Sequence, residues 1–391
     1  MSRVTVICHV EDASQVPACA CAVGRAVPLF SRKSNKKKAM GRVDFVAIDG
    51  KHRAQPSGAV LALQVESVRW AAELVDTPTA ELDTAAFVRR ARAKLRGVKG
   101  VRTRVISGSE LLDAGLGGLH GVGRAAEVPP RLLLLDYRPP VTRSKSKRQL
   151  TVALVGKGVV YDTGGLSLKI GGSMPGMKAD MGGAAAVVGA FAVLAGERVP
   201  HRVICAAPLA ENSINEKSYR NDDILTMHSG KTVEINNTDA EGRLLLADGV
   251  SYVGRKYSPD LIIDAATLTG AQLVATGHRH ASIVSNRDGV EELAVAAGRD
   301  SGDLVHPLLF APEFYQSEFK SLVADMKNSV KDRMNAQASC AAQFVYSHIA
   351  DLDVPWLHID MAGPATRSGR GSGYGVSLIA EIVRRLQNKH L

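Results

Sequence analysis

The segment VGKGVVYDTGGLSLKIGGSMPGMKADMGG, which covers Val155–Gly183, is made mostly of glycine and small or apolar residues. Its residues that could do chemistry are Lys157, Asp162, Lys169 and Asp180. The glycines let the backbone turn tightly and bring side chains together. Because Lys157 directly follows an apolar run, we expect it and Asp162 at the C-terminal end of a strand, where open α/β sheets present ligands.

A second charged segment, NNTDAEGRLLLAD, covers Asn236–Asp248. Asp239, Glu241 and Arg243 alternate in it, and alternate residues of an extended backbone point to the same side. The apolar run Leu244–Leu246 is expected to open a helix that anchors the segment. The pattern therefore predicts two carboxylates side by side, with an arginine next to them.

Acidic side chains gathered beside an apolar sheet repel one another, and burial makes the repulsion stronger. Three aspartates and one glutamate offer hard oxygen ligands, which suit a bridged pair of divalent ions about 3.5–4 Å apart. Two such ions can share a hydroxide, lower its pKa and polarise a carbonyl group, which is a scheme for hydrolysis. Taken alone, each residue has an ordinary alternative, because Asp239 and Glu241 fit a solvated turn and Lys157 or Lys169 fits a surface lysine.

Other catalytic patterns are weak or absent. The segment Gly156–Gly165 contains neither GxGxxG nor GxxxxGK[ST], which argues against a nucleotide site. No GxSxG occurs, and one SxxK, at Ser34–Lys37, lies in a charged run, which argues against a serine hydrolase. The eleven histidines form no HExxH, and we interpret His278 and His280 as structural or exposed residues.

The elements that must position these residues are expected in two parts of the chain. Residues 1–145 are expected to form a smaller N-terminal α/β domain, with Asp83 as a helix cap and Tyr137–Arg148 as a linker. Its predicted strands lie near Val4–Val10, Val43–Ile48, Ala59–Val65 and Arg102–Ile106, and its predicted helices near Ser67–Val75 and Thr84–Leu95.

Residues 146–391 are expected to form the catalytic domain. Apolar runs predict strands at Thr151–Val155, Val203–Ala207, Leu261–Asp264, Ala281–Val284 and Leu357–Met361. Helical patterns fall between them, at Ala184–Ala195, Leu244–Val253, Gly289–Gly298 and Ala338–His348. Strands that alternate with helices predict an α/β fold, in which a mixed central sheet is flanked by helices.

The net charge of +10 comes from the first part of the chain, because residues 1–150 carry +13 and the remainder carries −3. The main basic runs are Arg32–Lys38, Arg89–Arg96 and Arg143–Arg148. They fit either a nucleic-acid surface or solvated loops and one helix face. We favour the second interpretation, because no aromatic residues interleave the runs to stack on bases.

The cysteines and the apolar runs bear on location. The five cysteines form no CxxC pair and fit free thiols in a reducing compartment. No apolar run reaches the ~18–20 residues that span a bilayer, and the N-terminus, MSRVTVICHVED, lacks a signal-peptide pattern. We expect a cytoplasmic protein without a membrane partner; an organellar location stays open, since the sequence does not say whether its N-terminus is complete.

Both charged segments resemble the signature blocks of the leucyl aminopeptidase (cytosol aminopeptidase) family. NTDAEGR followed by an apolar stretch is highly specific, and GKG…YDTGG…SLK…MKADMGGAAA is nearly as specific. The resemblance runs from about residue 68 to the C-terminus. It includes Glu211–Asn212, Ser229–Val233, Ala266–Ala271, Ser301–Asp303, Ala324–Asn328 and His358–Gly363.

The resemblance implies a centre of two divalent ions, zinc or manganese, with magnesium as a further option. Asp162 and Glu241 would bridge both ions, Asp239 would complete one site, and Lys157 and Asp180 would complete the other. A lysine ligand must be neutral, so the adjacent cations must strongly depress the pKa of Lys157.

Two further residues resemble the catalytic residues of the family. Lys169 would stay charged, contact the substrate, polarise the scissile carbonyl and stabilise the developing oxyanion. Arg243 would hold a bicarbonate ion that serves as the general base. The amine of the substrate would contact Asp180, which fixes cleavage at the first peptide bond.

The resemblance also implies peptide substrates, and the first side chain would lie in a pocket that a methionine makes suitable for leucine or other apolar residues. The remaining positions assigned to substrate binding are Met177, Asn237, Thr267, Leu268 and Gly270. The family forms homohexamers, which we expect here as well.

Two departures and one rival belong with the resemblance. Residues 1–145 match only part of the N-terminal domain of the family, and the region after Asn328, SVKDRMNAQASC, replaces a Gly-rich stretch, which bears on substrate range. The rival is a non-enzymatic subunit or a second, nucleic-acid-binding role. We favour the enzyme, because every expected ligand and catalytic position is filled.

Overall fold

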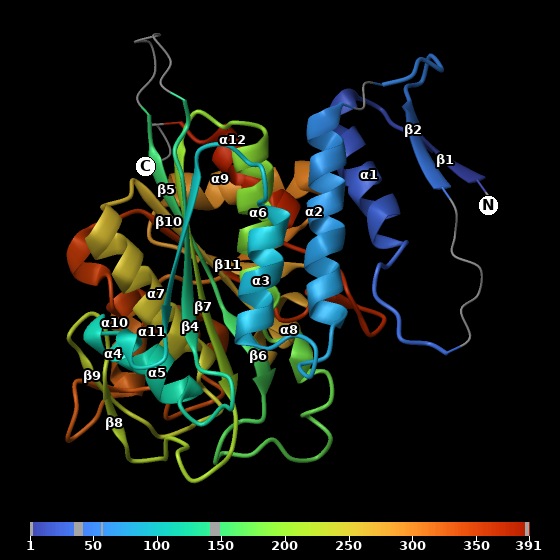
Figure 1. Cartoon of the computed structure of the whole chain (residues 1–391). Helices are drawn as coiled ribbons and strands as arrows, with labels where there is room; N and C mark the ends of the chain where they lie inside the picture. Colours follow the sequence, from blue (N-terminus) through green and yellow to red (C-terminus); the bar gives the residue numbers. More distant parts are fainter. Residues whose placement is uncertain (1–2, 35–41, 56–57, 141–148, 388–390) are drawn as a thin grey trace.

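A nine-stranded mixed sheet runs through the middle of the protein (Figure 1). The computed structural model describes residues 3–34, 42–55, 58–140, 149–387 and 391. Eight strands follow one another across the sheet, in the order β12 (Val305–Pro307), β11 (Ala281–Ser285), β14 (Trp356–Asp360), β10 (Leu261–Ala266), β5 (Thr151–Gly156), β7 (Arg202–Asn212), β4 (Arg131–Tyr137) and β3 (Val101–Ser107). The ninth strand, β6 (Gly158–Asp162), pairs with the C-terminal end of β7.

The central strands are parallel, and the edges contain antiparallel pairs. β14, β10, β5 and β7 pair in parallel, whereas β11 pairs antiparallel with β14, and β4 pairs antiparallel with β7 and β3. These strands are buried on both faces, as sheets covered by helices require. Successive side chains of β7 point to opposite faces of the sheet, since Cys205 belongs to one hydrophobic core and Ile204 to the other.

Helices cover both faces of the sheet. One core contains residues of α2 (Ala59–Asp76), α3 (Thr84–Lys94), α6 (Gly182–Gly196), α9 (Asp288–Ser301) and α12 (Val376–Arg385). The other core contains residues of α4 (Glu110–Asp113), α5 (Gly117–Gly123), α7 (Gly242–Tyr257), α10 (Pro312–Tyr315) and α11 (Gln337–Ser347). The predicted α/β class with a mixed sheet flanked by helices is therefore confirmed.

Helix α6 is apolar on all sides, and it is packed between the sheet and the helices α2 and α12. The stretch Met177–Gly196 is the one helical segment of the described residues that is long and apolar enough to cross a bilayer, yet 89% of its most apolar window is buried inside the protein. A helix that is hydrophobic all round and enclosed by protein is a core helix.

The chain begins in a small lobe beside α2 (Figure 1). There β1 (Arg3–His9) and β2 (Arg42–Ile48) form a parallel pair, and α1 (Val16–Arg25) packs against α2. The remaining short elements are β8 (Ile224–Thr226), β9 (Thr232–Glu234), β13 (Met326–Lys327), β15 (Thr366–Arg367), β16 (Arg370–Gly371), α8 (Gly270–Thr276), and the 3-10 turns Ala13–Gln15, Met177–Ala179, Gln316–Phe319 and Ala350–Leu352.

Most predicted elements are present, and one is wrong. The predicted strand Ala59–Val65 is the first part of helix α2, which continues through the helix predicted at Ser67–Val75. Its buried residues recur every three or four positions, and Ala, Leu, Glu and Gln favour helix over strand. Asp83 caps α3 as predicted, because its side chain accepts a hydrogen bond from the backbone N–H of Ala86.

The expected boundary at residue 145 falls between two strands of one sheet. β3 and β4 precede it, and β4 is hydrogen-bonded to β7, which follows it. The division into 1–145 and 146–391 stays a prediction. Of the basic runs, 143–148 and most of 32–38 lie outside the described residues, whereas Lys94 of the run Arg89–Arg96 pairs with Glu66 at 2.8 Å.

A buried histidine beside α11 predicts how stability depends on pH. His348 is fully buried and shares a hydrogen bond of 2.7 Å with Ser229. Burial, with smaller effects of Lys231 and Arg255, lowers the pKa of His348 to about 3. An unfolded histidine titrates near 6.5, so between about pH 6.5 and 3 the unfolded chain holds a proton that the folded chain lacks.

The contribution of His348 is therefore complete above pH 6.5 and is lost as the pH falls, by up to about 1.4 kcal/mol per pH unit. We expect His348→Asn to show a shallower decline in the free energy of unfolding between pH 7.5 and 5.5. Urea denaturation at three pH values measures it, and identical slopes in both proteins would contradict the assignment.

Candidate active site

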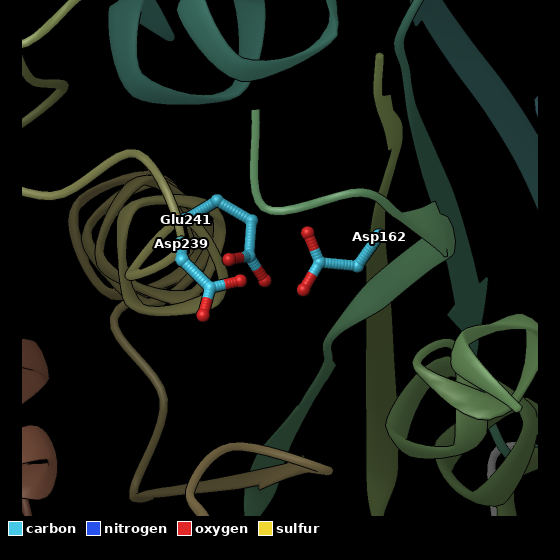
Figure 2. Close-up of side chains that lie close together, drawn as sticks. All are labelled: Asp162, Asp239 and Glu241. Atoms are coloured by element: carbon cyan, nitrogen blue, oxygen red, sulfur yellow. The ribbon is translucent and has the colours of Figure 1, made fainter. Parts of the chain in front are cut away.

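Three carboxylates converge at the C-terminal edge of the central sheet (Figure 2). Asp162 ends β6, Asp239 lies in a turn, and Glu241 precedes the first residue of α7. One oxygen from each lies within 4.8 Å of the others. The prediction that these side chains meet is therefore matched by the geometry, although the two segments are far apart in the sequence.

Two lysines lie between the acidic groups. Lys157 Nζ is 2.8 Å from Asp180 Oδ1 and 3.0 Å from Glu241 Oε1. Lys169 Nζ is 2.8 Å from Asp162 Oδ2 and 2.6 Å from Asp239 Oδ1. All six side chains of the predicted centre thus form one connected charge cluster, with four carboxylates and two ammonium groups.

The segment that carries Asp239 and Glu241 is a turn and not a strand, so the expectation of an extended backbone is wrong. Asn237 shapes the turn, since its side chain accepts a hydrogen bond from the N–H of Asp239. Glu241 already has helical backbone angles. Gly242 then lets α7 approach Lys157, because a Cβ at this position would lie 2.4 Å from Lys157 Cε.

Two asparagines from other segments hold the acidic residues in place. Asn212 Nδ2 donates to Asp162 Oδ1 at 2.8 Å and to the carbonyl of Thr238 at 3.1 Å. Asn328 Nδ2 donates to the carbonyl of Asn237 at 2.7 Å, and its Oδ1 accepts from the N–H of Asn236 at 2.9 Å. Asn328 therefore fixes the turn through both its donor and its acceptor, whereas Asn212 acts through its Nδ2 group alone.

The cluster holds more negative than positive charge, and the pKa values respond to it. Burial, and then the neighbouring Asp162, raises the pKa of Glu241 to about 8. Burial raises the pKa of Asp180 to about 6, although Lys157 opposes the shift. Burial alone would lower the pKa of Lys157, but the facing carboxylates of Asp180 and Glu241 raise it instead.

The donor set fits divalent cations. Four carboxylates face two ammonium groups in a buried site, so further positive charge would relieve the repulsion. Asp180 Oδ2 is buried without a hydrogen-bond partner among the described residues, which leaves one oxygen free to bind a cation. Lys157 would have to lose its proton to act as a ligand, and added divalent charge acts in that direction.

Arg243 lies in the first turn of α7, behind the cluster. Its guanidinium is buried, and its carbon Cζ lies 6.0 Å from the centre of the Phe344 ring. Burial lowers the pKa of Arg243 to about 10. Its Nε and Nη1 groups have no hydrogen-bond partner in the described part of the chain. A buried guanidinium with two unused donors is suited to hold an anion.

A cavity of about 560 Å³ opens over the cluster. Its wall includes every residue that the sequence assigned to substrate binding: Lys169, Met177, Asp180, Asn237, Thr267, Leu268 and Gly270. Thr267 also contacts the charge cluster, since its carbonyl accepts from Lys157 Nζ at 2.9 Å and its hydroxyl donates to Asp180 at 2.8 Å. The cavity therefore joins the acidic floor to an apolar wall.

Several residues that support the site carried no assigned role in the sequence. Asn212, Asn328 and Asp360 belong to short blocks of the family resemblance, which was the available signal. Asp360 ends β14, and its carboxylate accepts from the N–H of Leu268 at 3.1 Å and from Thr269 Oγ1 at 2.6 Å. It thereby fixes the segment that forms part of the cavity wall.

Comparisons with known proteins identify similar sequences and similar structures. The sequence model "Cytosol aminopeptidase family, catalytic domain" matches residues 69–380. The human "Probable aminopeptidase NPEPL1" is 46% identical over 394 residues, which cover 97% of this chain and 72% of the relative.

Two solved structures resemble the fold closely. The leucyl aminopeptidase from Trypanosoma brucei, solved with bestatin, has a TM-score of 0.91 at 40% identity, over 98% of this chain and 74% of the other. The bottromycin maturation enzyme BotP, solved with Mn, has a TM-score of 0.83 at 32% identity, over 97% of this chain and 83% of the other.

Proposed function

The chain belongs to the cytosol aminopeptidase family of metal-dependent hydrolases, and from this membership we propose that it removes N-terminal residues from peptides at a centre of two divalent ions. The observation that carries the proposal is the convergence of four carboxylates and two lysines on the floor of one cavity. Asp162 and Glu241 would be shared by both ions, Asp239 would belong to one, and Lys157 and Asp180 to the other.

When bound, the ions supply a Lewis acid for the scissile carbonyl and a water of lowered pKa. Zinc and manganese both suit these ligands, and magnesium is a further option. Lys169 remains charged, because its partners Asp162 and Asp239 raise its pKa against the effect of burial. It can donate hydrogen bonds to the oxygen on which negative charge develops.

Arg243 is the residue that we assign to hold a bicarbonate ion, the general base of the proposed reaction. The support is its pair of buried, unused N–H donors. The amine of the substrate is placed beside Asp180, which lines the cavity. An amine held there positions the first peptide bond over the cluster and excludes cleavage further along the peptide.

Met177 is expected to determine which first side chain is accepted. It lines the cavity together with Leu268, and its thioether adapts to branched apolar groups. Met177→Ala should lower the ratio of kcat/KM for leucine over alanine substrates by about tenfold, since the lost contacts are worth about one or two methylene groups. Steady-state kinetics on the two anilides measure the ratio. Met174→Ala is the control from the same loop, and an equal change in both variants would refute the assignment.

The proposed activity is tested by release of the chromophore from a leucine anilide after loading with manganese, with Asp239→Ala as the inactive control. The competing function is nucleic-acid binding through the basic first part of the chain, of which Arg89 and Arg92 are exposed on α3. No turnover after loading, together with a DNA shift at physiological salt, would favour that competitor.

Assembly and location are also proposals. We propose a homohexamer that acts in the cytoplasm, with family membership as the support. Light scattering coupled to gel filtration measures the first, and a mass near that of the single chain would refute it. Fractionation of cells that express the protein measures the second.

A further inference from the structure

Arg333 lines the cavity on the wall formed by the segment after Asn328. Its side chain is exposed, and it has no hydrogen-bond or ion-pair partner among the residues that the structure describes. The three lysines that line the cavity already have partners. Lys157 and Lys169 pair with the carboxylates, and Lys178 Nζ donates to the carbonyl of Asp76 at 2.6 Å. The guanidinium of Arg333 is therefore available to a ligand in the cavity.

The acidic neighbours of Arg333 are already used by the backbone. Glu318 accepts from the N–H of Asp332 at 3.0 Å and from Asn335 Nδ2 at 2.9 Å. Asp332 Oδ1 in turn accepts from the N–H of Met334 at 2.8 Å. These bonds engage both carboxylates with other groups of the loop 331–335, and neither carboxylate forms an ion pair with Arg333 among the described residues.

The loop is also tied to the catalytic turn. Asn236 Oδ1 accepts from the N–H of Ser329 at 2.9 Å, and Asn236 Nδ2 donates to its carbonyl at 3.2 Å. Asn328 holds the carbonyls of Asn237 and Ala240. Arg333 thus stands on a segment whose position relative to Asp239 and Glu241 is fixed by paired amide bonds.

We infer that Arg333 binds a carboxylate in the leaving part of the peptide, so that the enzyme prefers substrates with a negative charge just after the scissile bond. The inference rests on the proposed function. With the amine at Asp180 and the first side chain against Met177 and Leu268, the rest of the peptide must pass other residues that line the cavity, and Arg333 is one of them.

The carboxylate could come from two sources, which share one chemistry. In a dipeptide it is the C-terminal carboxylate, and in a longer peptide it is an aspartate or glutamate side chain at the second position. A guanidinium presents parallel N–H donors that match either group.

The experiment compares kcat/KM for matched peptides with the manganese-loaded enzyme. Leu-Asp-amide against Leu-Asn-amide isolates the side-chain carboxylate, and Leu-Gly against Leu-Gly-amide isolates the terminal one. We expect a preference of about fivefold for the charged member of at least one pair, as a partly exposed ion pair allows, and a smaller preference at high salt.

Arg333→Gln should abolish the preference and leave turnover of a leucine anilide unchanged. Lys331→Gln is the matched control, because Lys331 is exposed on the same loop but does not line the cavity, and it should keep the preference. A ratio near one in the wild type, or a preference that survives in Arg333→Gln, would overturn the inference while anilide turnover upholds the proposed function.

Two further outcomes are decisive. A preference for aspartate over asparagine as the first residue that disappears in Arg333→Gln would place this arginine beside the first side chain, which overturns the inference. Failure of the wild type to hydrolyse any substrate would overturn the proposed function and the inference together.

Discussion

Glu241→Gln is expected to lower kcat/KM for a leucine anilide by a factor on the order of 10³. Glu241 is 1% exposed and lies 3.0 Å from Lys157 Nζ, within the cluster of three converging carboxylates. An amide at this position removes one negative charge and turns N–H donors toward the cations that the site must hold. A loss of about 4 kcal/mol in charge stabilisation corresponds to a thousandfold in rate.

Binding and stability measurements separate a loss of the metal centre from a loss of the fold. The metal-free variant should melt close to the metal-free wild type, because the substitution removes repulsion among buried acids along with the contact to Lys157. Added manganese should raise the thermal midpoint of the wild type and not that of the variant, since a ligand stabilises a protein only in proportion to its binding.

A control for charge removal exists at the far end of α6. Glu197 pairs with Arg384 at 2.8 Å and is partly buried, but it does not line the cavity. Glu197→Gln should keep full activity and the manganese shift. Substantial activity in Glu241→Gln at saturating metal would refute the role of Glu241 as a shared ligand.

Several residues of the charge cluster could be predicted to lie at the site because their sequence signals are local. Lys157 and Asp162 follow an apolar run, and Asp239 and Glu241 precede one, so each pair lies at the end of an element that the sequence itself defines. A parallel sheet then brings such ends to one edge. That Lys169 and Asp180 join the carboxylates of Asp239 and Glu241 was expected only from the family resemblance. The spacing of residues alone does not show that the segments Val155–Gly183 and Asn236–Asp248 meet.

The residues that hold the acidic turn from distant segments could not be predicted from the sequence in the same way. Asn212 and Asn328 have ordinary neighbours in the sequence, and their roles exist only once β7 and the loop after β13 lie beside the catalytic turn. The helix start at Ala59 was missed for a related reason. Its first residues, AVLALQV, form a short and almost wholly apolar run, which a buried strand and a helix share, and packing against α6 selects the helix.

Arg333 shows where a departure from a family pattern becomes informative. The sequence reveals only that the region after Asn328 lacks a Gly-rich stretch. Whether this matters depends on which side chains of the region face the cavity, and the structure places Arg333 there with no competing partner among the described residues. The tertiary structure therefore shows that the difference in composition after Asn328 places a positive charge at the cavity.

Gly183→Ala is expected to lower the free energy of unfolding by roughly 3 kcal/mol, the upper part of the range for overpacked cores. A Cβ at Gly183 would lie 2.1 Å from the carbonyl oxygen of Ala265 and 2.8 Å from its carbonyl carbon. The carbonyl cannot rotate away, because it accepts the N–H of Lys157 at 3.0 Å. The helix α6 must therefore move away from β10.

The movement would be transmitted to the active site, so the same substitution should also reduce activity. The carbonyl of Lys157 accepts a hydrogen bond from the N–H of Ala184, which belongs to α6. Asp180 lies two residues before the first residue of this helix. Both proposed ligands of one metal site are thus attached to the backbone that the new methyl group displaces. The free energy of unfolding from urea denaturation and the rate of anilide hydrolysis should both be lower in this variant.

Gly50→Ala adds the same methyl group where nothing lies within 4 Å of the new Cβ, so it should change stability by less than about 0.5 kcal/mol. If Gly183→Ala matched this control in its denaturation midpoint, the close approach of α6 to β10 would not be a determinant of the fold. If stability fell while activity per folded molecule stayed unchanged, the site would tolerate the shift of α6. The geometry of Lys157 and Asp180 would then depend on the hydrogen bonds of Thr267 more than on the position of the helix.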